Sequence, residues 1–204
     1  MPRLEVDRAF PVPGEKLCGL AWDGHHLWHS DAGEERIYCF DPQDGNILRS
    51  FGCPNVRTCL AWDGTSLWQV AGQPKRLKCL DPADGYVRRE LELGSEAACG
   101  VEIDGGAFWL THEEGRIELR SLDDGQVLRE FDALPRIAGI TLADGVLWYA
   151  VDHLSLLVAV DPETGEERAR HQIDGIPTGL TWDGTRLWYA DIAERRIVGV
   201  VQRD

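Results

Sequence analysis

The chain has 204 residues, of which 43% are hydrophobic and 27% are charged, an ordinary composition for a globular domain with its own core. Its formal net charge of −14 at pH 7 excludes the cationic surface that nucleic-acid phosphates require, and an anionic membrane face would repel it. No apolar run approaches the ~18 residues of a membrane-spanning helix. The first residues also lack the pattern of a signal peptide. We therefore expect no nucleic-acid partner and no membrane partner.

A unit of about 40 residues is repeated five times along the chain. The openings of the five copies are GLAWDGHHLW from Gly19, CLAWDGTSLW from Cys59, GVEIDGGAFW from Gly100, GITLADGVLW from Gly139 and GLTWDGTRLW from Gly179. A unit of this length cannot bury its apolar faces alone, so each copy is expected to pack against its neighbours. The repeat therefore predicts the architecture.

The first copy illustrates the organisation within one unit. It contains four short β-type stretches, at residues 19–22, 27–30, 36–40 and 46–51. The Asp-Gly pair at 23–24 and the segment DPQDG at 41–45 are tight-turn signals. The second turn recurs at residues 81–85, 121–125 and 161–165. No segment shows helical periodicity of useful length.

Four antiparallel strands in each copy are typical of a β-propeller blade. We predict an all-β fold, a single five-bladed β-propeller over residues 1–204, with copies at 18–57, 58–98, 99–137, 138–177 and 178–204. The last copy has only three strands, and the strand-like segment from Leu4 to Val12 matches the missing fourth. This N-terminal strand is expected to join the C-terminal blade and close the ring, which removes an exposed sheet edge. We expect a monomer.

The tryptophans and cysteines follow the repeat. One slot of the unit holds Trp22, Trp62 and Trp182, and a second holds Trp28, Trp68, Trp109, Trp148 and Trp188; both sets are expected to pack between blades. The six cysteines form no C-x-x-C pair and are confined to the first half of the chain. We interpret them as reduced thiols in a cytoplasmic protein.

The G-L-x-W-D-G-x-x-L-W openings and the D-P-x-D/T-G turns resemble those of the five-bladed glutamine cyclotransferase family and, more distantly, streptogramin lyase-type propeller repeats. In the cyclotransferases, acidic and polar groups just before the first-strand Gly-Leu line the mouth of the central channel, bind the amino terminus of the peptide and shuttle protons. The matching residues here are Cys18, Thr58, Cys99, Ala138 and Thr178. None of them is a carboxylate, so acid–base chemistry would need a carboxylate from a neighbouring loop.

Two further sets of residues are expected on the same face as these first-strand starts. The ends of the second strands are Asp31, Ala71, His112, Val151 and Asp191, and the connections between copies include Asn55, Arg57 and Arg136. The candidate ligand-binding residues are therefore Cys18, Thr58, Cys99, Thr178, Asp31, His112 and Asp191. The Asp-Gly turns point to the opposite face, where the copies are alike.

A soft-ligand site is one interpretation of the thiols at the channel mouth. Cys18 and Cys99, with Cys59 one residue further inward, would favour a soft or borderline metal ion such as zinc, monovalent copper or mercury. The alternative is that the three residues are small apolar side chains in a crowded inner strand.

Three functions remain open at this point. The first is a non-catalytic propeller that binds a small molecule, a metal or a short peptide at the channel mouth. The second is an enzyme of lyase or cyclotransferase type that uses His112 or Asp191 for proton transfer. The third is a soft-metal or thiol-reactive protein that uses its cysteines. No complete catalytic motif decides whether the protein is an enzyme.

Overall fold

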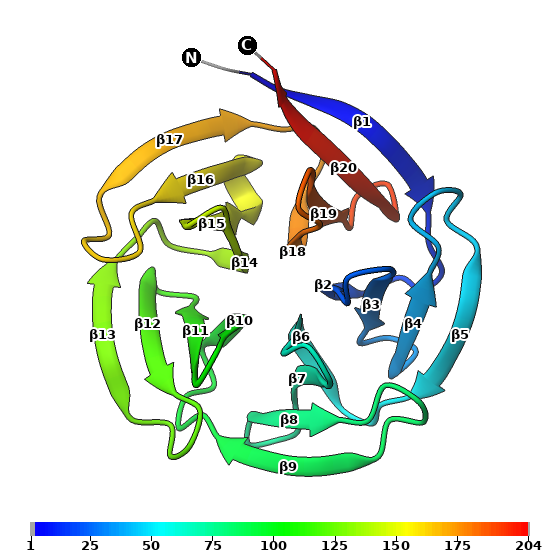
Figure 1. The fold of residues 1–204 in the computed structure, drawn as a ribbon, viewed down its shortest axis with the longest axis horizontal. Helices are drawn as coiled ribbons and strands as arrows, with labels where there is room; N and C mark the ends of the chain where they lie inside the picture. The colour runs from blue at the N-terminus through cyan, green and yellow to red at the C-terminus, as the bar shows by residue number, and fades with distance from the viewer. Residues whose placement is uncertain (1–2, 204) are drawn as a thin grey trace.

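A computed structural model describes residues 3–203 and shows five four-stranded antiparallel sheets arranged as blades around a central axis (Figure 1). The predicted all-β five-bladed propeller is confirmed. Within the described residues, no helix is long and apolar enough to cross a membrane.

The first three blades follow one another along the chain, and each runs from an innermost to an outermost strand. Blade 1 consists of β2 (Leu17–Trp22), β3 (Leu27–Asp31), β4 (Arg36–Phe40) and β5 (Ile47–Gly52). Blade 2 consists of β6 (Val56–Trp62), β7 (Leu67–Ala71), β8 (Arg76–Leu80) and β9 (Val87–Glu92). Blade 3 consists of β10 (Ala98–Asp104), β11 (Ala107–His112), β12 (Arg116–Ser121) and β13 (Val127–Asp132).

Blade 4 differs from the others by one short helical turn. It consists of β14 (Ile137–Ala143), β15 (Val146–Val151), β16 (Leu156–Val160) and β17 (Glu167–Gln172), with the 3-10 helix η1 (Asp152–Leu154) after β15. This helix was not expected from the sequence, since three residues are too few to give a periodic signal.

Blade 5 is assembled from both ends of the chain. It consists of β18 (Pro177–Trp182), β19 (Leu187–Asp191), β20 (Arg196–Arg203) and the N-terminal strand β1 (Arg3–Pro11). β1 runs antiparallel to β20, with Leu4 opposite Gln202 and Phe10 opposite Ile197. The two ends therefore lie side by side in Figure 1, as the sequence predicted.

The core consists of apolar clusters between neighbouring blades, and the tryptophans are part of them. Trp28, Trp109 and Trp188 are at most 2% exposed. In three blades the indole N–H of the buried tryptophan also donates to the aspartate of the first turn. These bonds are Trp28 to Asp23 at 2.8 Å, Trp68 to Asp63 at 2.7 Å and Trp188 to Asp183 at 2.7 Å.

Close approach of the innermost strands explains the glycine that opens most copies. A Cβ atom on Gly19 would lie 2.3 Å from the Leu60 nitrogen, and one on Gly179 would lie 2.7 Å from the Leu20 nitrogen. Neither backbone can give way without disturbing its own strand. The channel is therefore narrow, and a larger residue fits in this slot only where it can turn into the axis.

Arginines on the outer strands join one blade to the next. Arg8 donates to the Gln43 carbonyl at 2.7 Å, Arg89 to the Asp123 carbonyl at 2.7 Å, and Arg129 to the Pro162 carbonyl at 2.9 Å. Each acceptor lies in the turn between the third and fourth strands of the following blade. We call these three residues the latch arginines.

Candidate site at the mouth of the central channel

A pocket of about 180 Å³ lies where the innermost strands begin. The five first-strand residues singled out from the sequence line it together: Cys18, Thr58, Cys99, Ala138 and Thr178. The remaining lining residues are Leu17, Arg57, Glu113, Arg136, Ile137 and Asp152. Every blade thus contributes to one common pocket, which we call the mouth pocket.

The thiol of Cys59 lies at the axis of the ring, one residue inward from Thr58 of the mouth pocket. Cys59 occupies the slot that is glycine in the other four copies, and it is 2% exposed. Its thiol lies 3.2 Å from the Ala138 carbonyl and 3.8 Å from the Thr178 carbonyl, so it reaches across the axis to blades 4 and 5. Cys59 does not line the mouth pocket itself; its thiol fills space at the axis between blades 2, 4 and 5.

All three thiols proposed as soft ligands are protonated in this environment. Burial raises the pKa of Cys18 and of Cys59 to about 12, and that of Cys99 to about 11. Cys18 and Cys99 each donate to a nearby carbonyl at 3.2 Å. Among residues 3–203 no group of three or more histidine, cysteine or acidic residues is positioned to hold a metal ion. Metal binding stays a prediction that elemental analysis of the purified protein can test.

The hydroxyl of Thr58 is a buried polar group without a protein partner. Thr58 lines the mouth pocket, and its Oγ1 atom makes no hydrogen bond to the described residues. The corresponding Thr178 hydroxyl donates to the Ala190 carbonyl at 3.3 Å. A buried hydroxyl without a partner is costly, so Thr58 favours a bound polar molecule at this point.

Arg57 reaches the mouth because blade 2 contains an extra residue. Three residues of β6, from Arg57 to Cys59, lie between the pairs Val56–Ala71 and Leu60–Gln69, whereas only two residues occupy the same stretch of β2. Such a bulge redirects a side chain. The Arg57 guanidinium donates to the Gly72 carbonyl at 3.2 Å and to Gln73 Oε1 at 2.8 Å. Both acceptors are neutral, so its positive charge is not neutralised by them.

Blade 4 contributes an ion pair. Arg136 donates to Asp152 Oδ2 at 2.9 Å, and Asp152 is held at the pocket by η1. The backbone of Arg136 is in the left-handed region, with φ of 62°, and its N–H donates to the Glu113 carbonyl at 2.7 Å. This conformation is uncommon for a residue with a Cβ atom, and such residues cluster at functional sites.

Glu113 supplies a carboxylate to the same rim from blade 3. It is exposed, lines the mouth pocket and takes part in no ion pair with the described residues. Neither Glu113 nor Asp152 was among the site residues predicted from the sequence. Each is the residue directly after the predicted second-strand end, His112 or Val151 respectively.

Asp31 and Asp191 were expected at the mouth, but the structure places them elsewhere. Both are 0% exposed, and neither lines the mouth pocket. Asp31 accepts hydrogen bonds from the backbone N–H groups of Lys16, Gly33 and Glu34, each at 2.8 Å. Asp191 likewise accepts from Ile176 at 3.0 Å and from Arg196 at 2.9 Å. These carboxylates hold loops within their own blades in place. Neither is positioned to contact a ligand in the mouth pocket.

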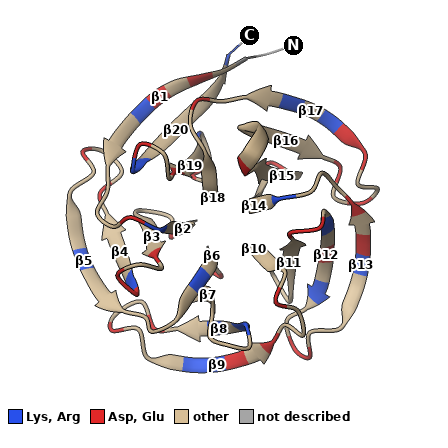
Figure 2. Ribbon diagram, turned by 180° about the vertical axis from the view of Figure 1, so that it is seen from behind, with Lys and Arg blue, Asp and Glu red and all other residues tan. Residues whose placement is uncertain are grey.

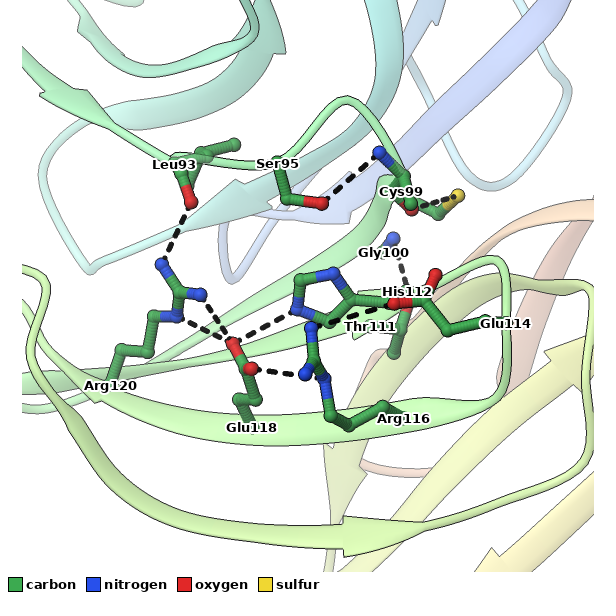
Figure 3. Close-up of polar contacts among 11 residues, drawn as sticks. Leu93, Ser95, Cys99, Gly100, Thr111, His112, Glu114, Arg116, Glu118 and Arg120 are labelled. Carbon is green, nitrogen blue, oxygen red and sulfur yellow. Dashed lines mark hydrogen bonds and ion pairs between the residues drawn. The ribbon is translucent and has the colours of Figure 1, made fainter.

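His112 is also fully buried and does not line the mouth pocket, and Figure 3 shows its ring directed toward Glu118. Its Nε2 atom lies 2.9 Å from Glu118, which Arg116 contacts at 3.1 Å and Arg120 at 2.5 Å. Burial opposes ionisation of Glu118, yet hydrogen bonds from His112 and Arg120 outweigh it and lower the pKa of that carboxyl group. His112 is therefore part of a buried charge network that stabilises blade 3.

The charges at the mouth stand out against largely uncharged inner strands. In Figure 2 most of the inner ribbon is tan, while β6 carries a blue segment, and the acidic and basic segments lie mainly on outer strands and loops. At the mouth, charge is confined to three consecutive blades: Arg57 in blade 2, Glu113 in blade 3, and the Arg136–Asp152 pair in blade 4. Blades 1 and 5 supply Cys18 and Thr178.

Five blades closed by the two chain ends, with a pocket of mixed charge at the hub, define a five-bladed β-propeller with a candidate ligand site at its channel mouth. The fold matches that of Myxococcus xanthus glutaminyl cyclase, with a TM-score of 0.85 and 14% identity over 100% of this chain and 98% of that one. No family model matches the chain, and neither does any curated protein.

Two other solved structures are also similar in fold. A streptogramin B lyase matches with a TM-score of 0.57 and 20% identity, over 100% of this chain and 73% of that one. A chain of a nidogen/laminin complex matches with a TM-score of 0.63 and 20% identity, over 86% of this chain and 72% of that one. At these identities the likeness describes the fold and leaves the chemistry to the pocket itself.

Proposed function

We propose that the protein binds a small zwitterionic molecule, such as an amino acid or a short peptide, in the mouth pocket. The observation that carries this proposal is the pair of unneutralised charges at the rim. Glu113 has no cationic partner among the described residues, and Arg57 is hydrogen-bonded only to neutral oxygen atoms. A ligand with one ammonium and one carboxylate group complements both.

The rest of the lining suits a ligand of this kind. The Thr58 hydroxyl makes no hydrogen bond to the described residues, and Leu17, Ile137 and Ala138 give the pocket apolar walls. A few polar groups in an otherwise apolar pocket are the usual basis of orientation and specificity. The volume of about 180 Å³ fits a small molecule and excludes a folded partner.

The test is calorimetric titration with three forms of one probe, the dipeptide glutaminyl-glycine, its N-acetylated form and its C-terminal amide. We expect the free dipeptide to bind best and both blocked forms to bind more weakly. Glu113→Gln should weaken binding of the free dipeptide several-fold and leave the affinity for the N-acetylated form unchanged. Glu114→Gln is the matched control, because Glu114 is the next residue and does not line the pocket. Equal affinity for all three forms would contradict the proposal.

A cyclotransferase-like activity is the alternative, and the carboxylates at the rim favour it. In this reaction the α-amino nitrogen of an N-terminal glutamine bonds to the side-chain carboxamide carbon, the carboxamide C–N bond breaks, and ammonia leaves with the proton lost by the amine. Glu113 and Asp152 are the groups at the mouth that can carry this proton. Such an activity would connect the chain with the enzyme named in the structural match.

Incubation of glutaminyl peptides with the protein, followed by measurement of ammonia and of the corresponding loss of peptide mass, tests this alternative. Activity that disappears in both Asp152→Asn and Glu113→Gln would establish the enzyme. Binding of the dipeptide without any release of ammonia would exclude this activity and support the proposal that the protein only binds its ligand.

A further inference from the structure

The interface between blades 4 and 5 lacks the arginine that joins other blades. In each blade, a cross-strand row runs from the buried tryptophan to the outer strand. In blades 2, 3 and 5 this row ends in a latch arginine, and in blade 1 it ends in Arg49, whose guanidinium lies 4.9 Å from the Trp28 ring centroid. In blade 4 the row is Trp148, Ala159 and Ala169. Ala169 therefore stands at the end of the row in blade 4, where each of the other four blades has an arginine.

Blade 5 also lacks the turn that a latch arginine from blade 4 would contact. In three blades the glycine of the turn between the third and fourth strands packs on a phenylalanine of the preceding blade. A Cβ atom would lie 2.5 Å from Phe10 at Gly45, 2.5 Å from Phe51 at Gly85, and 2.6 Å from Phe131 at Gly165. Blade 5 has no such turn, because its third and fourth strands, β20 and β1, are the two ends of the chain. The space that this turn would fill beside blade 4 is left open.

A cavity of about 310 Å³ lies in this interface. It is larger than the mouth pocket and lies at the opposite end of β14, beside the first turn of blade 4. Its walls are mainly apolar: Leu4, Ala143, Val146, Trp148, Trp182, Leu187, Val200 and Val201, with Asp144, Thr185 and Gln202 as the polar residues. We call it the side cavity. Its size and lining are those of a small-molecule site.

We propose that the side cavity is a second ligand site, which takes a flat aromatic molecule with a positive charge. Trp148 of blade 4 and Trp182 of blade 5 line it from its two sides, and aromatic rings favour flat aromatic partners. The turn before Trp148 is shortened to Asp144-Gly145, so this indole N–H does not make the bond to an aspartate that Trp28 and Trp188 make.

The charge of the ligand follows from Asp144. It is the one charged residue that lines the side cavity, it is exposed, and it forms no ion pair with the described part of the chain. The net charge of −14 adds to the attraction for a cation. A ligand whose cationic group lies near Asp144 and whose ring lies between Trp148 and Trp182 would contact both the acidic rim and the apolar wall of the side cavity.

Three probes share one ring and differ in charge: tryptamine, indole and indole-3-acetate. In calorimetric titrations we expect tryptamine to bind most tightly, indole more weakly and indole-3-acetate most weakly. The indole N–H resonances of Trp148 and Trp182 in the NMR spectrum of the protein should shift during titration with tryptamine. Equal affinity for the cationic and anionic probes, or shifts at neither tryptophan, would overturn the proposal.

Variants place the binding at this site. Asp144→Asn should weaken tryptamine binding about threefold to fivefold, because an exposed charge pair contributes modestly to affinity. The affinity for indole should be unchanged. Asparagine tolerates the left-handed conformation of this residue, whose φ is 49°. Asp104→Asn is the matched control in the equivalent turn of blade 3. If Glu113→Gln weakens tryptamine binding while Asp144→Asn does not, the cation binds in the mouth pocket and the side cavity is not its site.

Discussion

Individual residues that depart from the repeat carry the unusual chemistry of this protein. Glu102 is one of them, since the same slot holds Ala21, Ala61, Thr141 and Thr181 in the other copies. Its carboxyl group faces blade 4, where Oε1 lies 3.3 Å from Thr141 Oγ1 and 3.5 Å from the Leu142 nitrogen. Burial raises the pKa of Glu102 from 4.5 to about 8. Glu102 is therefore mainly protonated at neutral pH in the folded protein.

This shift predicts that stability falls as the pH rises from about 4.5 to about 8. Below this window both the folded and the unfolded states hold the proton; within it the unfolded state loses the proton first, which favours unfolding. Glu102→Gln should remove this contribution and be more stable than the parent at about pH 8, by on the order of 1–3 kcal/mol. Urea unfolding at several pH values measures the difference. The exposed Glu194→Gln is the control, and an unchanged pH profile for Glu102→Gln would contradict the prediction.

Cys59 is the second such residue, and its role at the channel axis can be measured. Cys59→Ala removes a buried sulfur atom that contacts blades 4 and 5, so we expect a loss of about 1 kcal/mol in the free energy of unfolding. Cys18→Ala, at the partly exposed rim, should cost less. Denaturant unfolding of both variants provides the comparison. A larger loss for Cys18→Ala would mean that the axial thiol does not hold the blades together.

At the scale of elements, the contacts between blades are repeated with small variations. Arg129 donates to the Pro162 carbonyl at 2.9 Å and to Glu163 Oε2 at 2.6 Å, both in blade 4. Arg129→Ala should destabilise the protein by about 1–2 kcal/mol, because charged hydrogen bonds between two blades are lost. Arg168 pairs with Asp161 within its own blade, so Arg168→Ala should cost about 0–1 kcal/mol. Equal losses in thermal unfolding would show that the latch arginines are ordinary surface pairs.

The mouth pocket could be predicted in part from the sequence, and the second strands show where the prediction stopped short. The recurring openings indicate where each strand starts, and so the ring from Cys18 to Thr178 was placed at the mouth correctly. The second strands end at the predicted residues, but the side chains that reach the rim belong to the residues directly after these ends. Side chains alternate between the two faces of a strand, so a shift of one residue exchanges the buried His112 for Glu113 at the rim. The bulge that exposes Arg57 and the helix that holds Asp152 depend on tertiary contacts and leave no periodic signal in the sequence.

At the scale of the whole molecule, one strand pairing makes the ring continuous. Repetition of the unit predicts five blades, and the missing strand of the last copy predicts closure by the first residues, because a propeller with an incomplete blade would expose an edge. β1 meets this requirement and also contributes to the core. Phe10 is 8% exposed and lies 6.0 Å from the Trp188 ring and 6.1 Å from the Phe40 ring, so β1 connects blade 5 to blade 1.

Removal of residues 1–11 should therefore abolish the cooperative unfolding of the whole ring. Loss of the Phe10 side chain alone would cost about 3–5 kcal/mol, a large part of the stability of a typical domain. The shortened chain exposes the edge of β20, so we expect it to associate in size-exclusion chromatography and to melt at a lower temperature. A peptide of residues 3–11 added in trans should restore the parent behaviour, whereas the same peptide with Phe10→Ala should restore little. If the shortened chain remains monomeric and melts like the parent, the pairing of β1 with β20 does not hold the ring closed.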